Sequence, residues 1–162
     1  MTATCREACC SVTPRFTVAE LFERGFRRSR DKPFAIEGET VRDAEGNSAR
    51  FSLELDGGKL AGLRFRVSSC TTLIAYSEAL AELLPGLDAG LAAHFTPAEL
   101  VAALPGVPAL KQNRAVLAVA ALRSALLVGG ESRITNQAAR PRAGGNPELD
   151  SRLRGNERNV SA

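Results

Sequence analysis

The sequence contains a single histidine, His94, one tyrosine and no tryptophan. Histidine is a frequent proton carrier in catalysis and a common metal ligand, so one copy excludes a histidine-rich metal centre. The sequence also lacks a Ser-His-Asp set, a Walker loop and a G-x-G-x-x-G motif after a strand. We therefore expect that this protein is not an enzyme, and we interpret His94 as a surface residue instead of a metal ligand.

Long apolar runs are also missing. A membrane-spanning helix needs roughly 20 consecutive apolar residues, and we find no segment that approaches this length. Residues 1–11 have no apolar core of a signal peptide behind their single Arg. These absences predict a cytoplasmic protein that does not bind a membrane.

The net charge is small, +3 for the whole chain. Basic side chains outnumber acidic ones in residues 1–33 and 129–162, and acidic ones predominate between them. Nucleic-acid binding domains group Arg and Lys on a folded element and add aromatic side chains that stack on bases. Because the aromatic residues here occupy core-like positions, we expect no nucleic-acid partner.

Length and cysteine placement define the domain organisation. The 162 residues, 44% of them hydrophobic, suffice for one core of ordinary size. Three of the four cysteines, Cys5, Cys9 and Cys10, lie near the N-terminus, where no fourth Cys or His completes a zinc site. We predict a flexible cysteine-containing arm over residues 1–15, one domain over 16–128 and a disordered polar tail over 129–162.

Alternating apolar and polar residues predict two strands, RFSLEL at 50–55 and LRFRV at 63–67. Asp56-Gly57-Gly58-Lys59 between them contains residue pairs that accept a positive φ, which favours an antiparallel hairpin. Residues 34–41 form a weaker extended segment. The expected sheet is therefore small, antiparallel and three-stranded.

Helical periodicity predicts the remaining elements. An amphipathic helix is expected over 17–28, a helix over 71–84 that ends at Pro85-Gly86, a short helix that begins at Thr96-Pro97, and a long apolar helix over 110–128. Glu78 and Glu82 lie four residues apart on one of these helices, and we interpret them as a solvated face. Helices after a hairpin indicate an α+β fold in which helices cover a small antiparallel sheet.

The segment LRFRVSSCTTLIAYSEALAELLPG at 63–86 resembles the strand, cysteine and helix of the NifU/IscU-type iron–sulfur cluster assembly scaffolds. The segment TPAELVAALPGVPALKQNRAVLAVAALRSAL at 96–126 is similar to the short helix and the long C-terminal helix of the same family. With the preceding strands, the resemblance covers roughly residues 45–128. It implies an IscU/SufE-like fold, a role in iron–sulfur cluster assembly and a cysteine desulfurase or another assembly protein as partner.

The resemblance also implies a ligand set of three cysteines, an aspartate and a histidine beside the third cysteine. Cys70 matches the middle cysteine of that set. Residues 45–49 read Glu-Gly-Asn-Ser-Ala where the first cysteine and the aspartate belong, and Asn113-Arg114 replaces the His-Cys pair. The resemblance thus makes Cys70 the expected ligand of iron or of an iron–sulfur cluster, with an incomplete ligand set and with Gly46, Asn47, Asn113 and Arg114 as expected site neighbours.

Two interpretations of Cys70 stay open. The start of a helix and a nearby Arg114 favour the thiolate, which can accept a sulfane sulfur or ligate one corner of a cluster that is shared between subunits of a homo-oligomer. Alternatively, Cys70 is a small buried hydrophobic residue. Two functions follow: a scaffold-like protein in which Cys70 takes part in sulfur or cluster transfer, or a SufE-like sulfur acceptor or adaptor that binds a desulfurase without holding a cluster.

Overall fold

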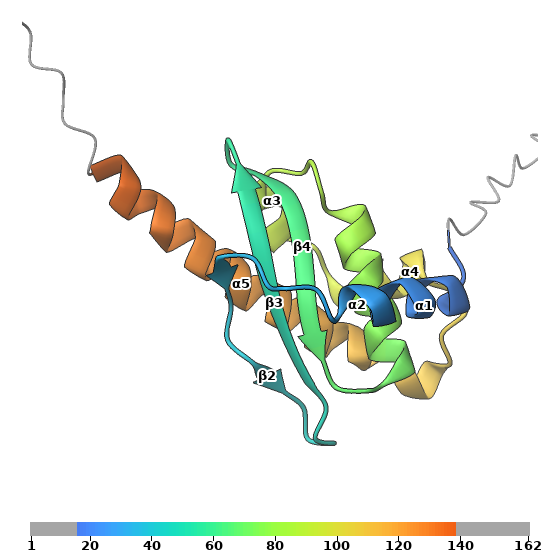
Figure 1. Cartoon of the computed structure of the whole chain (residues 1–162). Helices are drawn as coiled ribbons and strands as arrows, with labels where there is room; N and C mark the ends of the chain where they lie inside the picture. Colours follow the sequence, from blue (N-terminus) through green and yellow to red (C-terminus); the bar gives the residue numbers. More distant parts are fainter. Residues whose placement is uncertain (1–15, 139–162) are drawn as a thin grey trace, which may run out of the picture.

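A computed structural model of the chain describes residues 16–138 and shows a small open sheet with helices packed against it (Figure 1). In chain order the elements are α1 (Val18–Arg28), β1 (Ile36–Glu37), β2 (Val41–Arg42), β3 (Ser48–Asp56), β4 (Lys59–Val67), α2 (Thr71–Leu83), α3 (Ala89–Ala93), α4 (Pro97–Ala103), a 3-10 helix (Ala109–Lys111) and α5 (Arg114–Ala138). The predicted α+β class and the helical cover are confirmed.

β3 and β4 form the antiparallel hairpin that the alternation predicts, and β3 is the central strand of the sheet. Leu53 lies opposite Leu63 and Phe51 opposite Phe65, and Gly57 and Gly58 turn the chain with φ values of +54° and +93°. The inward-facing residues Ala49, Phe51, Leu53, Leu63 and Phe65 are all buried. They pack against α2 and α5, which cover this face of the sheet (Figure 1).

The third strand of the predicted sheet is divided into two short strands. β1 pairs with Leu53 and Ser52, and β2 pairs with Ala49 and Ser48, so both line the same edge of β3. The break falls at Gly38, where an added Cβ atom would lie 2.5 Å from the backbone nitrogen of Ala125. The sheet therefore has four strands, and the close approach of α5 explains the interruption.

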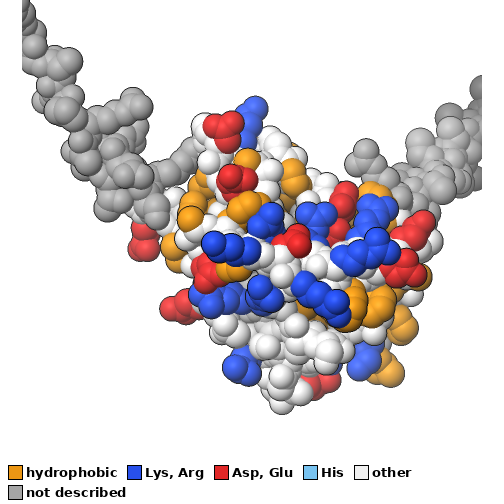
Figure 2. Space-filling model, viewed as in Figure 1, with side chains coloured by type: hydrophobic (Ala, Val, Ile, Leu, Met, Phe, Trp, Pro, Cys, Tyr) orange, Lys and Arg blue, Asp and Glu red, His pale blue; other side chains and the backbone are white. Residues whose placement is uncertain are grey.

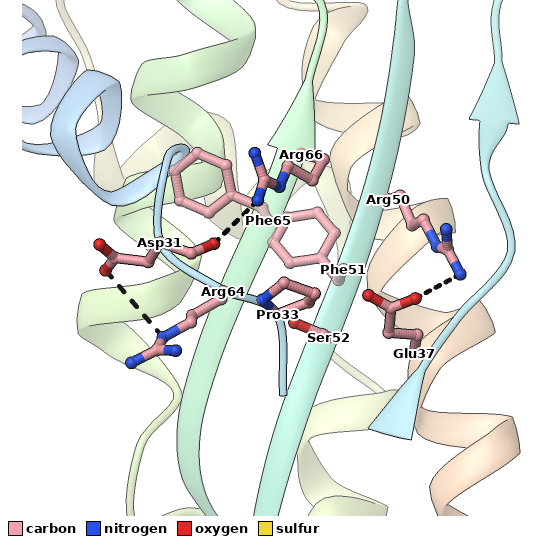
Figure 3. Close-up of a pocket in the computed structure, with 9 residues that line it drawn as sticks. All are labelled: Asp31, Pro33, Glu37, Arg50, Phe51, Ser52, Arg64, Phe65 and Arg66. Atoms are coloured by element: carbon pink, nitrogen blue, oxygen red, sulfur yellow. Dashed lines mark hydrogen bonds and ion pairs between the residues drawn. The ribbon is translucent and has the colours of Figure 1, made fainter. Parts of the chain in front are cut away.

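The outer face of the sheet is braced by ion pairs. Figure 2 shows Lys and Arg side chains gathered across this view of the molecule. Figure 3 shows that Arg50 contacts Glu37 and that Arg64 and Arg66 reach Asp31 through its carboxylate and its backbone oxygen. These arginines hold the segment after α1 against the hairpin. The expectation of no nucleic-acid partner stays a prediction.

The predicted solvated face of α2 is wrong for Glu78. Its side chain is fully buried, and Nε of Arg28 donates to Oε2 of Glu78 at 2.7 Å while Nη2 donates to Oε1 at 3.0 Å. α1 covers the second side of α2, with Gly25 packed against Ile74 and Glu78. Burial raises the pKa of Glu78, although the hydrogen bonds and charge of Arg28 act in the opposite direction.

The predicted end of the last helix at residue 128 is also wrong, because α5 continues to Ala138 through Gly129 and Gly130. An added Cβ atom at Gly129 would lie 3.2 Å from a methyl group of Leu55, so this glycine allows close packing of helix on sheet and does not end the helix. The remainder of the predicted tail, residues 139–162, lies outside the described residues, as does the predicted arm over 1–15.

The prediction that the chain lacks an apolar segment of membrane-spanning length is also wrong. Residues Ala109–Glu131 form a helical stretch that is long and apolar enough to cross a membrane, with a mean hydropathy of 1.3. Of its most apolar window, 56% is buried inside the fold. Burial of this kind is typical of the core helix of a globular domain, which is the position that α5 occupies against β3.

Candidate functional site

Three segments that are distant in sequence meet at one end of the sheet. The loop between β2 and β3 supplies Asp43, Glu45 and Asn47, the turn after β4 supplies Cys70, and the start of α5 supplies Asn113 and Arg114. The backbone N–H of Ser68 donates to the oxygen of Ser48 at 2.9 Å, which joins the first two segments. Side chains at the start of α5 contact the β2–β3 loop directly.

The β2–β3 loop is shaped by hydrogen bonds to Asp43. The backbone N–H of Asn47 donates to Oδ1 of Asp43 at 2.8 Å, and the Asn47 side-chain amide donates to Oδ2 at 2.9 Å. Gly46 adopts a φ of +82°, which few other residues tolerate, and closes the turn. The turn thereby places the carboxylates of Asp43 and Glu45 on the same side, facing α5.

Arg114 is the buried centre of the site, with 2% of its surface exposed. Its Nη1 atom donates to Oδ2 of Asp43 at 2.8 Å and to Oε1 of Glu45 at 3.1 Å, and its Nη2 atom donates to Oε2 of Glu45. The hydrogen bond with Glu45 raises the pKa of Arg114 above its ordinary value, with a further contribution from Cys70. A permanent positive charge is thus enclosed by two carboxylates.

The same contacts lower the pKa values of both carboxyl groups. For Glu45 the largest cause is its hydrogen bond with Arg114, followed by one with Asn113. For Asp43 partial burial acts to raise the pKa, but the hydrogen bonds from Asn47 and the charge of Arg114 outweigh it. Both side chains are therefore carboxylates at neutral pH.

We expect the stability of the domain to fall in acid because of this pair. The unfolded chain takes up protons near the ordinary carboxyl pKa of about 4, whereas folded Asp43 and Glu45 resist protonation. Their stabilisation is complete above that pH and is lost as the pH falls through their lowered folded pKa values. Glu78, whose pKa is raised, contributes with the opposite sign, since its contribution falls as the pH rises through its folded pKa.

Urea unfolding between pH about 3 and 7 measures this dependence. The Asp43→Asn, Glu45→Gln double variant should show a flatter profile than the wild type over the acidic part of the range. Glu54→Gln, which removes an exposed carboxylate on β3, is the matched control and should follow the wild-type profile. Equal acid sensitivity in the double variant would contradict the assignment.

Cys70 lies at the N-terminal end of α2. Its backbone oxygen accepts the first helical hydrogen bond from Ile74 at 2.9 Å, and its backbone N–H donates to Ser68 at 2.7 Å, which fixes the entry into the helix. Cys70 is partly exposed and packs against the hydrophobic core. It also lies within interaction range of the Arg114 guanidinium. Cys70 is therefore not a fully buried hydrophobic residue.

Sequence reasoning selected Gly46, Asn47, Asn113 and Arg114 as site neighbours, and the structure places all of them around the same loop. It missed Asp43 and Glu45, which supply the acidic partners of Arg114. A signal was present, because Asp43-Ala44-Glu45-Gly46-Asn47 combines an Asp that can accept from its own turn with a Gly for a positive φ.

With this geometry in place, comparison with known proteins identifies the family. Residues 22–128 match the family model described as the NifU-like N terminal domain, which is more than half of the chain. The chain belongs to the NifU-like N-terminal domain family. The family resemblance predicted from residues 45–128 is confirmed and extends toward α1.

Individual relatives share limited sequence identity with this NifU-like domain or match only part of it. The nitrogen fixation protein NifU of Cereibacter sphaeroides is 37% identical over 81 residues, which is 50% of this chain and 33% of that protein. The chain thus spans about a third of this curated relative. A solved structure described as an iron–sulfur cluster assembly scaffold for the SUF system, from Fervidobacterium islandicum AW-1, matches with 16% identity and a TM-score of 0.46 over 64% of this chain and 94% of that one.

A second solved structure, of a hypothetical protein, matches with 18% identity and a TM-score of 0.45. It covers 67% of this chain and 98% of that chain. The family assignment rests on the family model and not on these two structural likenesses.

The described part of this NifU-like domain does not fit a complete metal or cluster site. Among residues 16–138, no group of three or more His, Cys, Asp or Glu side chains is placed to hold a metal ion. Asp43 and Glu45 are paired with Arg114, and exposed His94 ends α3 as the predicted surface histidine. Cys5, Cys9 and Cys10 lie outside the described residues. The site therefore offers one thiol next to a cation that is already neutralised.

Proposed function

We propose that this protein works in iron–sulfur cluster assembly as a scaffold-like protein in which Cys70 takes part in sulfur transfer. Membership of the NifU-like family supports the process. The observation that carries the role of Cys70 is its position: a partly exposed thiol at the start of a 13-residue helix, beside the guanidinium of Arg114. Reactive cysteines are typically partly exposed, whereas fully buried structural cysteines are inert.

The transfer itself is a thiol exchange. A cysteine desulfurase, the proposed partner, carries a sulfane sulfur as a persulfide on its own cysteine. The Cys70 thiolate attacks the outer sulfur of that persulfide, the donor S–S bond breaks, a new S–S bond to Cys70 forms, and the desulfurase cysteine leaves as a thiolate. The exchange consumes no oxidant or reductant. Cys70 accepts and passes on sulfur, and the domain needs no catalytic group of its own.

A cluster that involves Cys70 requires donors from elsewhere. Iron–sulfur clusters are held by about four protein ligands, and the described residues offer one thiol. The remaining ligands would come from a second copy of the chain or from an assembly partner. We accordingly propose a cytoplasmic protein that acts within an assembly and does not hold a cluster on one domain alone.

Persulfide mapping tests this proposal. The full-length chain is incubated anaerobically with a cysteine desulfurase and cysteine, and each cysteine is then examined for one added sulfur atom by peptide mass spectrometry. Persulfide should appear on Cys70 before Cys5, Cys9 or Cys10, and Cys70→Ser should abolish the early modification. A variant in which the three N-terminal cysteines are replaced by Ser should retain it. Equal labelling of all four cysteines would refute the role of Cys70.

Anaerobic reconstitution with iron and sulfide separates the scaffold-like role from an adaptor that holds no cluster. Thiolate-to-iron absorption that disappears in Cys70→Ser would place Cys70 among the ligands of a shared cluster. Absorption that survives this substitution would come from the N-terminal cysteines. A colourless protein that still acquires the Cys70 persulfide would favour the sulfur-acceptor alternative.

A further inference from the structure

Arg114 retains one donor without an acceptor. Its two terminal nitrogens are engaged by Asp43 and Glu45, but its Nε atom is buried and has no hydrogen-bond partner among the described residues. An unsatisfied buried donor is unfavourable, and a charged one is more so. Such a group calls for a physical explanation, because most buried polar atoms in folded proteins are paired.

Cys70 lies within side-chain interaction range of the same guanidinium. The interaction raises the pKa of Arg114, yet it does not supply an acceptor that satisfies Nε. A thiol sulfur is a weak acceptor, and its position is fixed by the hydrogen bonds at the start of α2. The site thus combines a partly exposed cysteine with a buried cationic donor that has capacity for one more acceptor.

We propose that Nε of Arg114 and Cys70 together form a binding site for the terminal sulfur of a persulfide. This proposal rests on the proposed function, since it concerns the sulfur that Cys70 accepts. A persulfide places its outer sulfur about 2.05 Å beyond the cysteine sulfur. That outer atom carries the negative charge and accepts a charge-assisted hydrogen bond more strongly than a thiol does. Nε gains the acceptor that it lacks in the sulfur-free state.

The two carboxylates have a defined part in this site. They engage Nη1 and Nη2 from the side of the β2–β3 loop, which fixes the plane of the guanidinium and leaves Nε as the available donor. Arg114 therefore acts as a positioning residue that stabilises bound sulfur. Arg114 supplies a fixed positive charge to the site. A scaffold that holds a metal would instead need a metal ligand at this position.

An exchange equilibrium measures this stabilisation. The full-length protein, with Cys5, Cys9 and Cys10 replaced by Ser, is equilibrated anaerobically with defined ratios of glutathione persulfide and glutathione. The exchange breaks one S–S bond and forms another, so the fraction of Cys70 that carries sulfur gives the equilibrium constant directly. A hydrogen bond that exists only in the persulfide state raises this constant.

Arg114→Lys keeps the positive charge but removes Nε and the planar fork. It should lower the equilibrium constant about tenfold or more, because hydrogen bonds to charged groups are strong enough for such a factor. Alkylation of the sulfur-free Cys70 thiol should change much less. Arg123→Lys, in an exposed arginine that contacts backbone oxygens near α3, is the matched control and should leave the constant unchanged.

Several outcomes would overturn the proposal. One is an unchanged constant in folded Arg114→Lys, and another is an equal loss of alkylation and persulfide formation, which would indicate a purely structural role. If Arg114→Lys does not fold, the Cys70→Ser variant that retains Cys5, Cys9 and Cys10 decides. Its cysteines should take up sulfur with an equilibrium constant about tenfold or more below that of Cys70, and an equal constant would refute the site. Failure of the proposed function is distinguishable, since the desulfurase would then not load Cys70 although glutathione persulfide loads it in an Arg114-dependent way.

Discussion

Arg28→Ala is expected to lower the free energy of unfolding by about 3 kcal/mol or more. The substitution removes both hydrogen bonds that Arg28 donates to Glu78 and leaves a fully buried carboxylate without its main partner. Removing one member of a buried ion pair is costly because the remaining charge has lost its hydration and its counterion. The effect should appear as a shift of the urea midpoint with little change in slope.

The loss in Arg28→Ala should grow with pH. Burial already raises the pKa of Glu78, and removal of the guanidinium takes away the hydrogen bonds and the charge that chiefly oppose this shift. At low pH the carboxyl group is neutral and tolerates burial, whereas at higher pH the folded state must bury a charge or give up α1. Stability of the variant therefore falls as the pH rises through the raised pKa.

Two further variants separate the ion pair from a general effect of charge. Arg27→Ala removes the neighbouring, exposed arginine of α1 and should change stability by less than about 0.5 kcal/mol. Arg28→Met combined with Glu78→Leu replaces the pair by apolar groups of similar size and should be close to neutral or stabilising. A similar small loss in Arg28→Ala and Arg27→Ala would show that Glu78 does not depend on this pair.

This ion pair also shows where sequence reasoning reached its limit. The alternation and the Gly57-Gly58 turn determine the β3–β4 hairpin, because both are local properties of the chain. The environment of Glu78 is not local, since its partner lies 50 residues earlier, on α1. The residues of α2 from Leu73 to Ala81 are all buried, so this part of the helix is covered on every side. The carboxylate of Glu78 therefore needs a buried partner.

The candidate site was predictable in outline and not in its chemistry. The family resemblance located Cys70 and the start of α5, and the connection between β2 and β3 brought the third segment to them. The charges that define the site, Asp43 and Glu45, do not follow from the family resemblance, because the resemblance points to thiol ligands at these positions. Arg114 is a buried cation at the start of α5, and a buried charge needs a partner of opposite sign. The carboxylates of Asp43 and Glu45 on the facing loop supply that charge.

Two glycine positions depend on tertiary packing in the same way. The sequence predicts that the last helix ends at residue 128, but α5 runs through Gly129 and Gly130, and Gly129 packs against Leu55. Gly38 was given no role, although it sets the distance between the β1–β2 connection and α5. Whether a glycine ends an element or permits a close approach depends on what packs against it, which a single sequence does not contain.

Gly38→Ala is expected to destabilise the domain by about 1–3 kcal/mol and to disturb the site as well. The added methyl group would lie 2.5 Å from the nitrogen and 2.7 Å from the Cα atom of Ala125, and backbone atoms of a helix cannot rotate aside as a side chain can. The β1–β2 segment must move away from α5. That movement strains the hydrogen bond from the backbone N–H of Glu39 to Ser124, which measures 2.8 Å.

The movement of the β1–β2 segment should also affect the site around Cys70, because β2 leads directly into Asp43. A displaced β2 shifts the loop that holds the Arg114 guanidinium, so loading of Cys70 with sulfur from a desulfurase should slow in Gly38→Ala at a temperature where the variant is still folded. Gly130→Ala is the matched control, because nothing lies within 4 Å of its added Cβ atom in α5. It should raise stability by up to about 1 kcal/mol through helix propensity and leave sulfur loading unchanged. Wild-type stability in Gly38→Ala would mean that α5 does not approach the β1–β2 connection closely, and the explanation of the divided third strand would fail with it.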